Sequence, residues 1–275
     1  MSRMRRKSSR ALGLAGVLLG GLLLTGCFDV EQTLVLEKDL SGQAGFTMKV
    51  DMEPMVVMML NMQRSMEGKE GAPTAAEIEK AKADFLASST RTGEKLDPEK
   101  QKEELAKQLP AGVKLLDSRF EEKDLGLLAS FNLGFDDVDK LKQVRLAAKK
   151  PDPAAGAEAG GPPAPDNPFD TPFSDLVVEE TGDTILLTTK PRNPLEEQKQ
   201  EMGGADIAPD MEKQLEEAFK GLRIAWKIKA PFQVLEHNAT RRDGDTLVWE
   251  YTLDSMKTMD PKKMEEGIRV KYKKS

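Results

Sequence analysis

The strongest constraint on the fold is a series of short segments in which apolar and polar residues alternate, joined in pairs by tight turns. The first pair covers residues 29–37 and 43–52, with a glycine-containing turn between them. Further turns of this kind are found at residues 122–124, 181–183 and 243–244, and the chain ends in the strand-like segment IRVKYKK. Two segments with a period of two about a tight turn predict a β-hairpin with one buried face.

Polar segments between the hairpins have helix signals. Pro54 is suited to the first turn of a helix that ends at Gly68. Thr74 and Glu77 have the spacing of a capping box, and Pro98 stands at the first position of another helix. Hairpins with helices gathered between them predict an α+β fold, in which a curved antiparallel β-sheet has helices packed on one face.

Residues 150–172 are unsuited to a packed fold. They contain seven prolines, together with alanine and glycine, and they have no apolar period. This composition predicts a flexible linker or insertion. Neither flanking part offers enough strands to close a core alone, so we expect residues 27–149 and 173–275 to form one α+β domain.

Residues 1–26 are predicted to be a lipoprotein signal peptide. Five basic residues precede an apolar run at residues 11–24, and Leu24-Thr25-Gly26-Cys27 resembles a bacterial lipobox. The alternative is an uncleaved membrane helix. Residues 11–28 contain five glycines and fall short of the roughly 20 apolar residues that such a helix needs.

Cys27 is the only cysteine of the chain and is the predicted lipidation site. A thiolate is nucleophilic enough to take a thioether-linked lipid, and several acyl chains hold a protein firmly on a bilayer. Phe28 follows where an inner-membrane retention signal often has aspartate. We therefore expect an outer-membrane protein that faces the periplasm if the cell has two membranes, and otherwise a protein on the outer face of the cytoplasmic membrane.

Composition narrows the range of functions that the chain can have. The predicted mature chain keeps all 47 acidic residues and loses five of the 41 basic ones, which argues against nucleic acid as a partner. With one cysteine and one histidine, His237, the chain lacks an ordinary zinc site. His237 has no nucleophile motif beside it, and no glycine-rich phosphate loop is present. We expect no cofactor, no metal and no catalysis.

Methionines gather in the first predicted helix. Six of the 14 methionines lie between residues 52 and 66, and one helical face carries four of them: Met55, Met59, Met62 and Met66. This stripe has three interpretations. It could be the core face of the helix, it could line a groove for a lipid, or its thioethers could hold Cu(I). The four methionines are the candidate ligand-binding residues.

Two motifs resemble the LppM-type lipoprotein domain of bacterial envelopes. The first is V-x-x-T-L-V-L-x-x-D-x-S-G-x-x-G within residues 27–50, and the second is I-K-A-P-F-x-V-x-x-x-N-A-x-x-x-x-G-x-T-L-x-W at residues 228–249. Leu40 stands where family members typically have glycine, and Pro231-Phe232 replaces a Pro-Gly pair. The resemblance implies a sheet that curves around an apolar cavity, and a role in binding envelope lipids or glycolipids.

These observations lead to one leading hypothesis and one alternative. The first is a membrane-anchored, non-catalytic binding module for an envelope lipid or glycolipid. The second is an envelope scaffold that binds another protein and has no lipid cavity. A lipid binder needs a dry cavity, whereas a scaffold should have a filled core and an exposed apolar patch.

Overall fold

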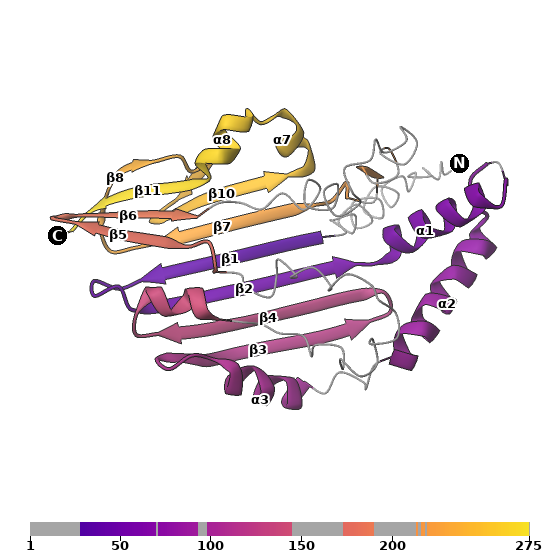
Figure 1. The fold of residues 1–275 in the computed structure, drawn as a ribbon, viewed down its shortest axis with the longest axis horizontal. Coiled ribbons are helices and arrows are strands. Elements are labelled where there is room, and N and C mark those ends of the chain that lie inside the picture. The colour runs from indigo at the N-terminus through magenta and orange to yellow at the C-terminus, as the bar shows by residue number, and fades with distance from the viewer. Residues whose placement is uncertain are drawn as a thin grey trace, which may run out of the picture.

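A computed structural model describes residues 28–69, 71–92, 98–144, 173–189, 213, 216–217 and 219–274. The predicted signal peptide, Cys27 and the predicted linker at 150–172 lie outside these residues. The α+β class is confirmed, because two β-sheets are accompanied by several helices (Figure 1).

The larger sheet has seven strands in the order β3-β4-β2-β1-β7-β10-β9. Their bounds are β1 Phe28–Leu36, β2 Gly42–Asp51, β3 Val113–Lys123, β4 Gly126–Phe135, β7 Arg223–Lys229, β9 Arg241–Asp243 and β10 Thr246–Thr252. All neighbours are antiparallel except β1 and β7, which run parallel. The prediction of a purely antiparallel sheet was wrong at this pair, because these strands are far apart in sequence and no hairpin joins them.

A second, antiparallel sheet has four strands in the order β5-β6-β11-β8. Their bounds are β5 Val177–Thr181, β6 Thr184–Thr189, β8 Gln233–His237 and β11 Ile268–Lys273. The predicted single sheet is therefore two sheets, because the chain passes from one to the other between β7 and β8. Leu187, Val270 and Tyr272 of the small sheet belong to the same buried cluster as Trp226 and Trp249 of the large one.

Local sequence signals explain the turns and the helix ends. Gly182 and Gly244 occupy the predicted hairpin turns with positive φ. At the start of a helix, Thr74 and Glu77 form the predicted capping box, in which Glu77 Oε2 accepts a 2.8 Å hydrogen bond from the Thr74 backbone N–H. Pro54 lies in the first turn of its helix, as predicted.

Apart from the 3₁₀-helix η1, whose Val138 and Leu141 are buried in the core, the helices lie at the ends and edges of the large sheet (Figure 1). Their bounds are α1 Glu53–Met66, α2 Ala75–Thr92, α3 Pro98–Gln108, the 3₁₀-helix η1 Val138–Gln143, α7 Leu253–Thr258 and α8 Pro261–Glu266. Helix α3 contacts β3 and α7 contacts β10, whereas α1 and α2 form a helical hairpin that extends beyond the end of the sheet. In the described part of the chain, no helix is both long and apolar enough to cross a membrane.

Candidate binding surface

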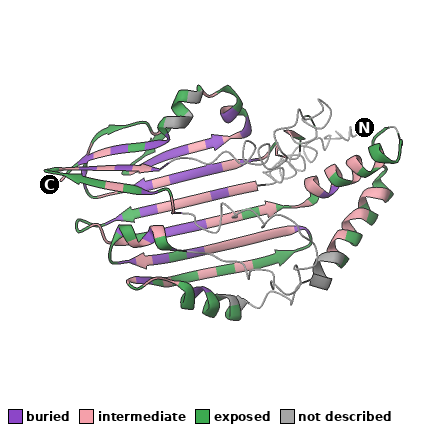
Figure 2. Cartoon of the chain, viewed as in Figure 1, coloured by how far each residue is buried: buried purple, intermediate pink, exposed green. Residues whose placement is uncertain are grey.

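One face of the large sheet, which we call the inner face, is apolar and forms most of the core. Its two ends differ in burial. At the end where β1 turns into β2, which we call the turn end, Leu34 and Leu133 are 0% exposed. Residues of the small sheet belong to the same buried cluster as the inner face. Towards the other end, where β1 begins and β2 ends, β2 and β4 are coloured as intermediate in burial (Figure 2).

Half-buried apolar residues of that second end form a group on the inner face. We call it the open apolar end, and it consists of Phe28, Met48, Val50, Phe120, Leu127 and Ala129. The strand register places Phe28, Val50 and Leu127 in one row across three strands. Met48, Ala129 and Phe120 form the next row. Ala129 is the smallest side chain of this row.

A polar side chain interrupts the inner face one row further in. Gln32 lies between Phe46 and Trp226 in the register, and its Oε1 atom is buried with no hydrogen-bond partner among the described residues. Pockets for apolar ligands commonly contain a few such polar groups, which orient the ligand. Sequence reasoning did not identify Gln32. The available signal was the gap that it leaves in the alternation of Val30, Leu34 and Leu36.

Helix α1 places the four candidate methionines along one face, and the structure leaves two of them largely exposed. Met59 is 55% exposed and Met66 is 82% exposed, whereas Met55 and Met62 are half-buried. The only fully buried residue of this helix is Val56. The stripe therefore begins beside the open apolar end and continues outward beyond the sheet.

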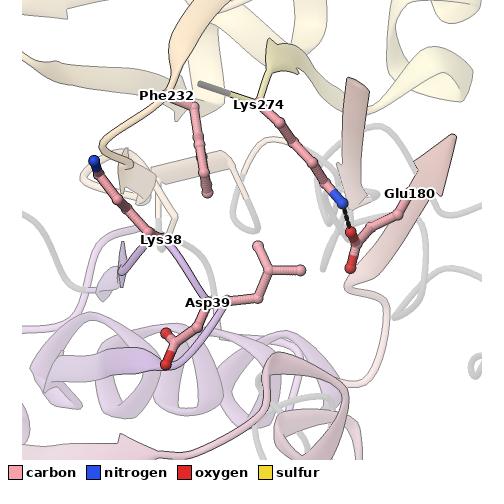
Figure 3. Close-up of a pocket in the computed structure, with 6 residues that line it drawn as sticks. Lys38, Asp39, Glu180, Phe232 and Lys274 are labelled. Carbon is pink, nitrogen blue, oxygen red and sulfur yellow. Dashed lines mark hydrogen bonds and ion pairs between the residues drawn. The ribbon is translucent and has the colours of Figure 1, made fainter. Parts of the chain in front are cut away.

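A small cleft lies at the turn end. Its volume is about 380 Å³, and its lining residues are Lys38, Asp39, Leu40, Glu180, Phe232 and Lys274. Leu40 and Phe232 supply its apolar part, and Lys274 forms an ion pair with Glu180 across its rim (Figure 3). Hydrogen bonds from Ser41 lower the pKa of Asp39. Leu40 has a φ of 64°, an unusual conformation for leucine.

The opposite, outer face of the large sheet carries a cluster of charged residues. Arg223 is 2.7 Å from Asp29 and 3.2 Å from Glu250, and it thereby joins β7 to both of its neighbours. Burial raises the pKa of Glu31, but Lys227, at 2.8 Å, and Arg223 outweigh this effect, so the pKa falls below its ordinary value. Each of these charges has an opposite partner, so this cluster stabilises the sheet and offers no unpaired charge to a ligand.

His237, the single histidine of the sequence, makes a local contact with the backbone. The His237 ring accepts a hydrogen bond from the Ala239 backbone N–H through Nδ1, at 3.1 Å. Within the described ranges, no group of histidine, cysteine and carboxylate side chains could hold a metal ion. The two tryptophans, Trp226 and Trp249, are buried in the core. What the site offers is therefore apolar surface with a single amide.

Comparison with solved structures finds the NMR structure of the folded domain of Mycobacterium tuberculosis LppM. The two chains are 10% identical, the match covers 92% of this chain and 94% of that chain, and the TM-score is 0.38. It is a domain of the type that the two sequence motifs resemble. No family model matches the chain, and no curated protein matches it.

Proposed function

We propose that this protein is a non-catalytic, lipid-anchored module of a bacterial cell envelope, and that it binds the acyl portion of a lipid or glycolipid at its open apolar end. The observation that carries the proposal is the half-buried apolar surface beside the start of β1. Covering such a surface with an acyl chain is favourable, since each methylene of a ligand that is buried contributes about 0.8 kcal/mol to the binding free energy.

The predicted anchor supports the same location. Cys27 directly precedes Phe28, the first residue of β1, and consecutive Cα atoms are about 3.8 Å apart. Acyl chains on Cys27 therefore enter the bilayer next to the open apolar end. A lipid can then move from the membrane to the protein over a short path. We propose the outer membrane, on its periplasmic side, in a cell with two membranes, and otherwise the outer face of the cytoplasmic membrane.

The methionine stripe of α1 extends the apolar surface. Met55 and Met62 are half-buried, and Met59 and Met66 continue the stripe outward. Methionine side chains are flexible and polarizable, so they adapt to acyl chains of different shape. The amide of Gln32 would be the polar group that a ligand reaches at the inner limit of this surface.

Native mass spectrometry of residues 28–275, expressed in bacteria and purified gently, tests the proposal. Leu127 and Leu128 are a matched pair: both are half-buried, but Leu127 pairs with Val50 on the inner face and Leu128 with Lys49 on the outer one. We expect lipid-mass adducts on the wild-type chain and on Leu128→Glu. In Leu127→Glu, the affinity for lipid should fall about tenfold, which corresponds to ~1.4 kcal/mol.

Two outcomes would contradict the proposal. One is a clean protein mass that persists after incubation with envelope lipids. The other is an equal loss of adducts in both variants while circular dichroism shows that both are folded. Either result would favour the scaffold alternative, in which the open apolar end binds another protein.

A further inference from the structure

The methionine stripe faces away from the rest of the helical hairpin. Two ion pairs define the side of α1 that packs on α2: Glu53 with Lys82 at 2.7 Å, and Arg64 with Glu77 at 2.5 Å. Glu53 and Arg64 are eleven residues apart, about three full turns, so they share one side of the helix. Met62 follows Glu53 by nine residues, about two and a half turns, and therefore lies on the opposite side.

All four methionines share this opposite side. At about 100° per residue, Met55, Met59, Met62 and Met66 fall within roughly one sixth of the helix circumference, centred opposite the ion pairs. The outer half of the stripe has nothing from α2 over it, as the exposed fractions of Met59 and Met66 show. An apolar stripe of this kind on a water-soluble helix calls for a partner surface.

The sheet register shows at which end of the large sheet α1, and with it the stripe, lies. Phe28 pairs with Val50, and α1 begins at Glu53, so the helix leaves the sheet at the end where β1 begins (Figure 1). The predicted lipid anchor, Cys27, is attached to the same end. A bilayer that holds this anchor is therefore the nearest large apolar phase to the stripe.

We propose that the methionine face of α1 docks on the surface of the bilayer that holds Cys27, with α2 on the water side. The proposal rests on the lipid anchor of the proposed function. The stripe is short, and the helix has no cluster of basic residues, so the contact is apolar and weak by itself. The anchor makes it effective by keeping α1 at a high local concentration beside the membrane.

Site-directed spin labelling of the full lipoprotein tests this orientation. The protein is reconstituted in vesicles of phosphatidylethanolamine and phosphatidylglycerol, and its attachment is checked by flotation. Because Cys27 is acylated, Met66→Cys gives a single free thiol for a nitroxide. Two exposed positions serve as controls: Lys80→Cys on α2, and Lys38→Cys at the turn end, about 30 Å from the anchor along the nine residues of β1.

The measured quantity is the collision rate of the nitroxide with a water-soluble nickel chelate relative to that with oxygen. We expect this ratio to be at least threefold lower at position 66 than at positions 80 and 38 in vesicle-bound protein. Equal ratios at the three positions in floating vesicles would overturn the docking but leave the anchor intact. Failure to float would overturn the anchor and the docking together. If the nitroxide at position 66 is shielded only at high protein density, and spin–spin broadening appears with the shielding, a second copy of the chain covers the stripe. That result would overturn the proposal.

Discussion

Trp249 Nε1 donates a hydrogen bond of 2.7 Å to Asn238 Oδ1, and this bond joins the two sheets. Trp249 belongs to β10 of the large sheet, whereas Asn238 follows β8 of the small one. The same Oδ1 accepts a bond from the Arg269 backbone N–H at 2.8 Å, and Asn238 Nδ2 donates to the Gly267 carbonyl at 2.6 Å. One amide therefore fixes three segments.

Replacement of this amide should destabilise the protein. Asn238→Ala leaves the indole N–H of the buried Trp249 without its partner, and we expect a loss of about 2 kcal/mol in the free energy of unfolding. Urea denaturation followed by tryptophan fluorescence measures it. Asn132→Ala, at an exposed position of β4, is the control and should change stability by less than about 0.5 kcal/mol. Equal effects of the two substitutions would contradict the role of Asn238.

Gly42 is required by the close approach of the chain at the β1–β2 turn. A Cβ atom at this position would be 2.0 Å from the backbone carbonyl oxygen of Val35, and a backbone atom cannot move aside as a side chain can. Gly42→Ala should therefore cost about 3 kcal/mol in unfolding free energy. Gly182→Ala is the comparison, because its Cβ meets nothing within 4 Å and only its φ of +59° is unfavourable, at about 1–2 kcal/mol. A smaller loss at Gly42 than at Gly182 would refute this explanation.

Gln32 is expected to reduce the stability of the ligand-free protein. Its buried Oε1 atom has no hydrogen-bond partner among the described residues, and an unsatisfied buried oxygen costs about 1–3 kcal/mol. Gln32→Leu should thus raise the unfolding free energy by about 1 kcal/mol or more, as measured by chemical denaturation. Gln43→Leu, exposed on β2, should leave it unchanged. If Gln32→Leu lowers stability, the amide has a partner in solution.

Both tyrosines of the chain should resist ionisation while the protein is folded. Burial raises the pKa of Tyr251 from 10.0 to about 12 and that of Tyr272 further. Because the folded pKa exceeds the unfolded one, folding stability is fully present below pH 10 and declines as pH rises toward 12. Tyrosinate absorbance should therefore stay near zero at pH 10 in the folded protein and reach half its maximum in urea. If one full equivalent of tyrosine titrates near pH 10 while the protein stays folded, that result would contradict the burial of one of the two rings.

The sequence predicted the local parts of the fold well. The hairpins and their turns follow from alternation and from glycine, and the capping box of Thr74 and Glu77 forms as its spacing indicates. The parallel pairing of β1 with β7 could not be read in this way, because the contacts that favour it, such as Arg223 with Asp29, join residues far apart in the chain. Helices α7 and α8 were also missed, since each has only six residues.

The candidate surface likewise has one part that could be predicted from the sequence and one part that could not. The methionine stripe could be predicted because helical period alone places four methionines on one face. The open apolar end could not, because Leu34 and Met48 look alike in an alternating pattern. In the structure Leu34 is buried and Met48 is half-buried, a difference that depends on contacts between segments far apart in the chain.

The most direct test of the account is photo-crosslinking of the full lipoprotein in vesicles that contain a phospholipid with a diazirine in its acyl chain. Proteolysis and mass spectrometry then locate the attached lipid. The account predicts attachment within residues 46–50 and 120–129, and loss of that attachment in Leu127→Glu but not in Leu128→Glu. Attachment confined to residues 38–40 and Phe232 would place the lipid in the turn-end cleft and contradict the account. No attachment to the folded domain would contradict lipid binding altogether.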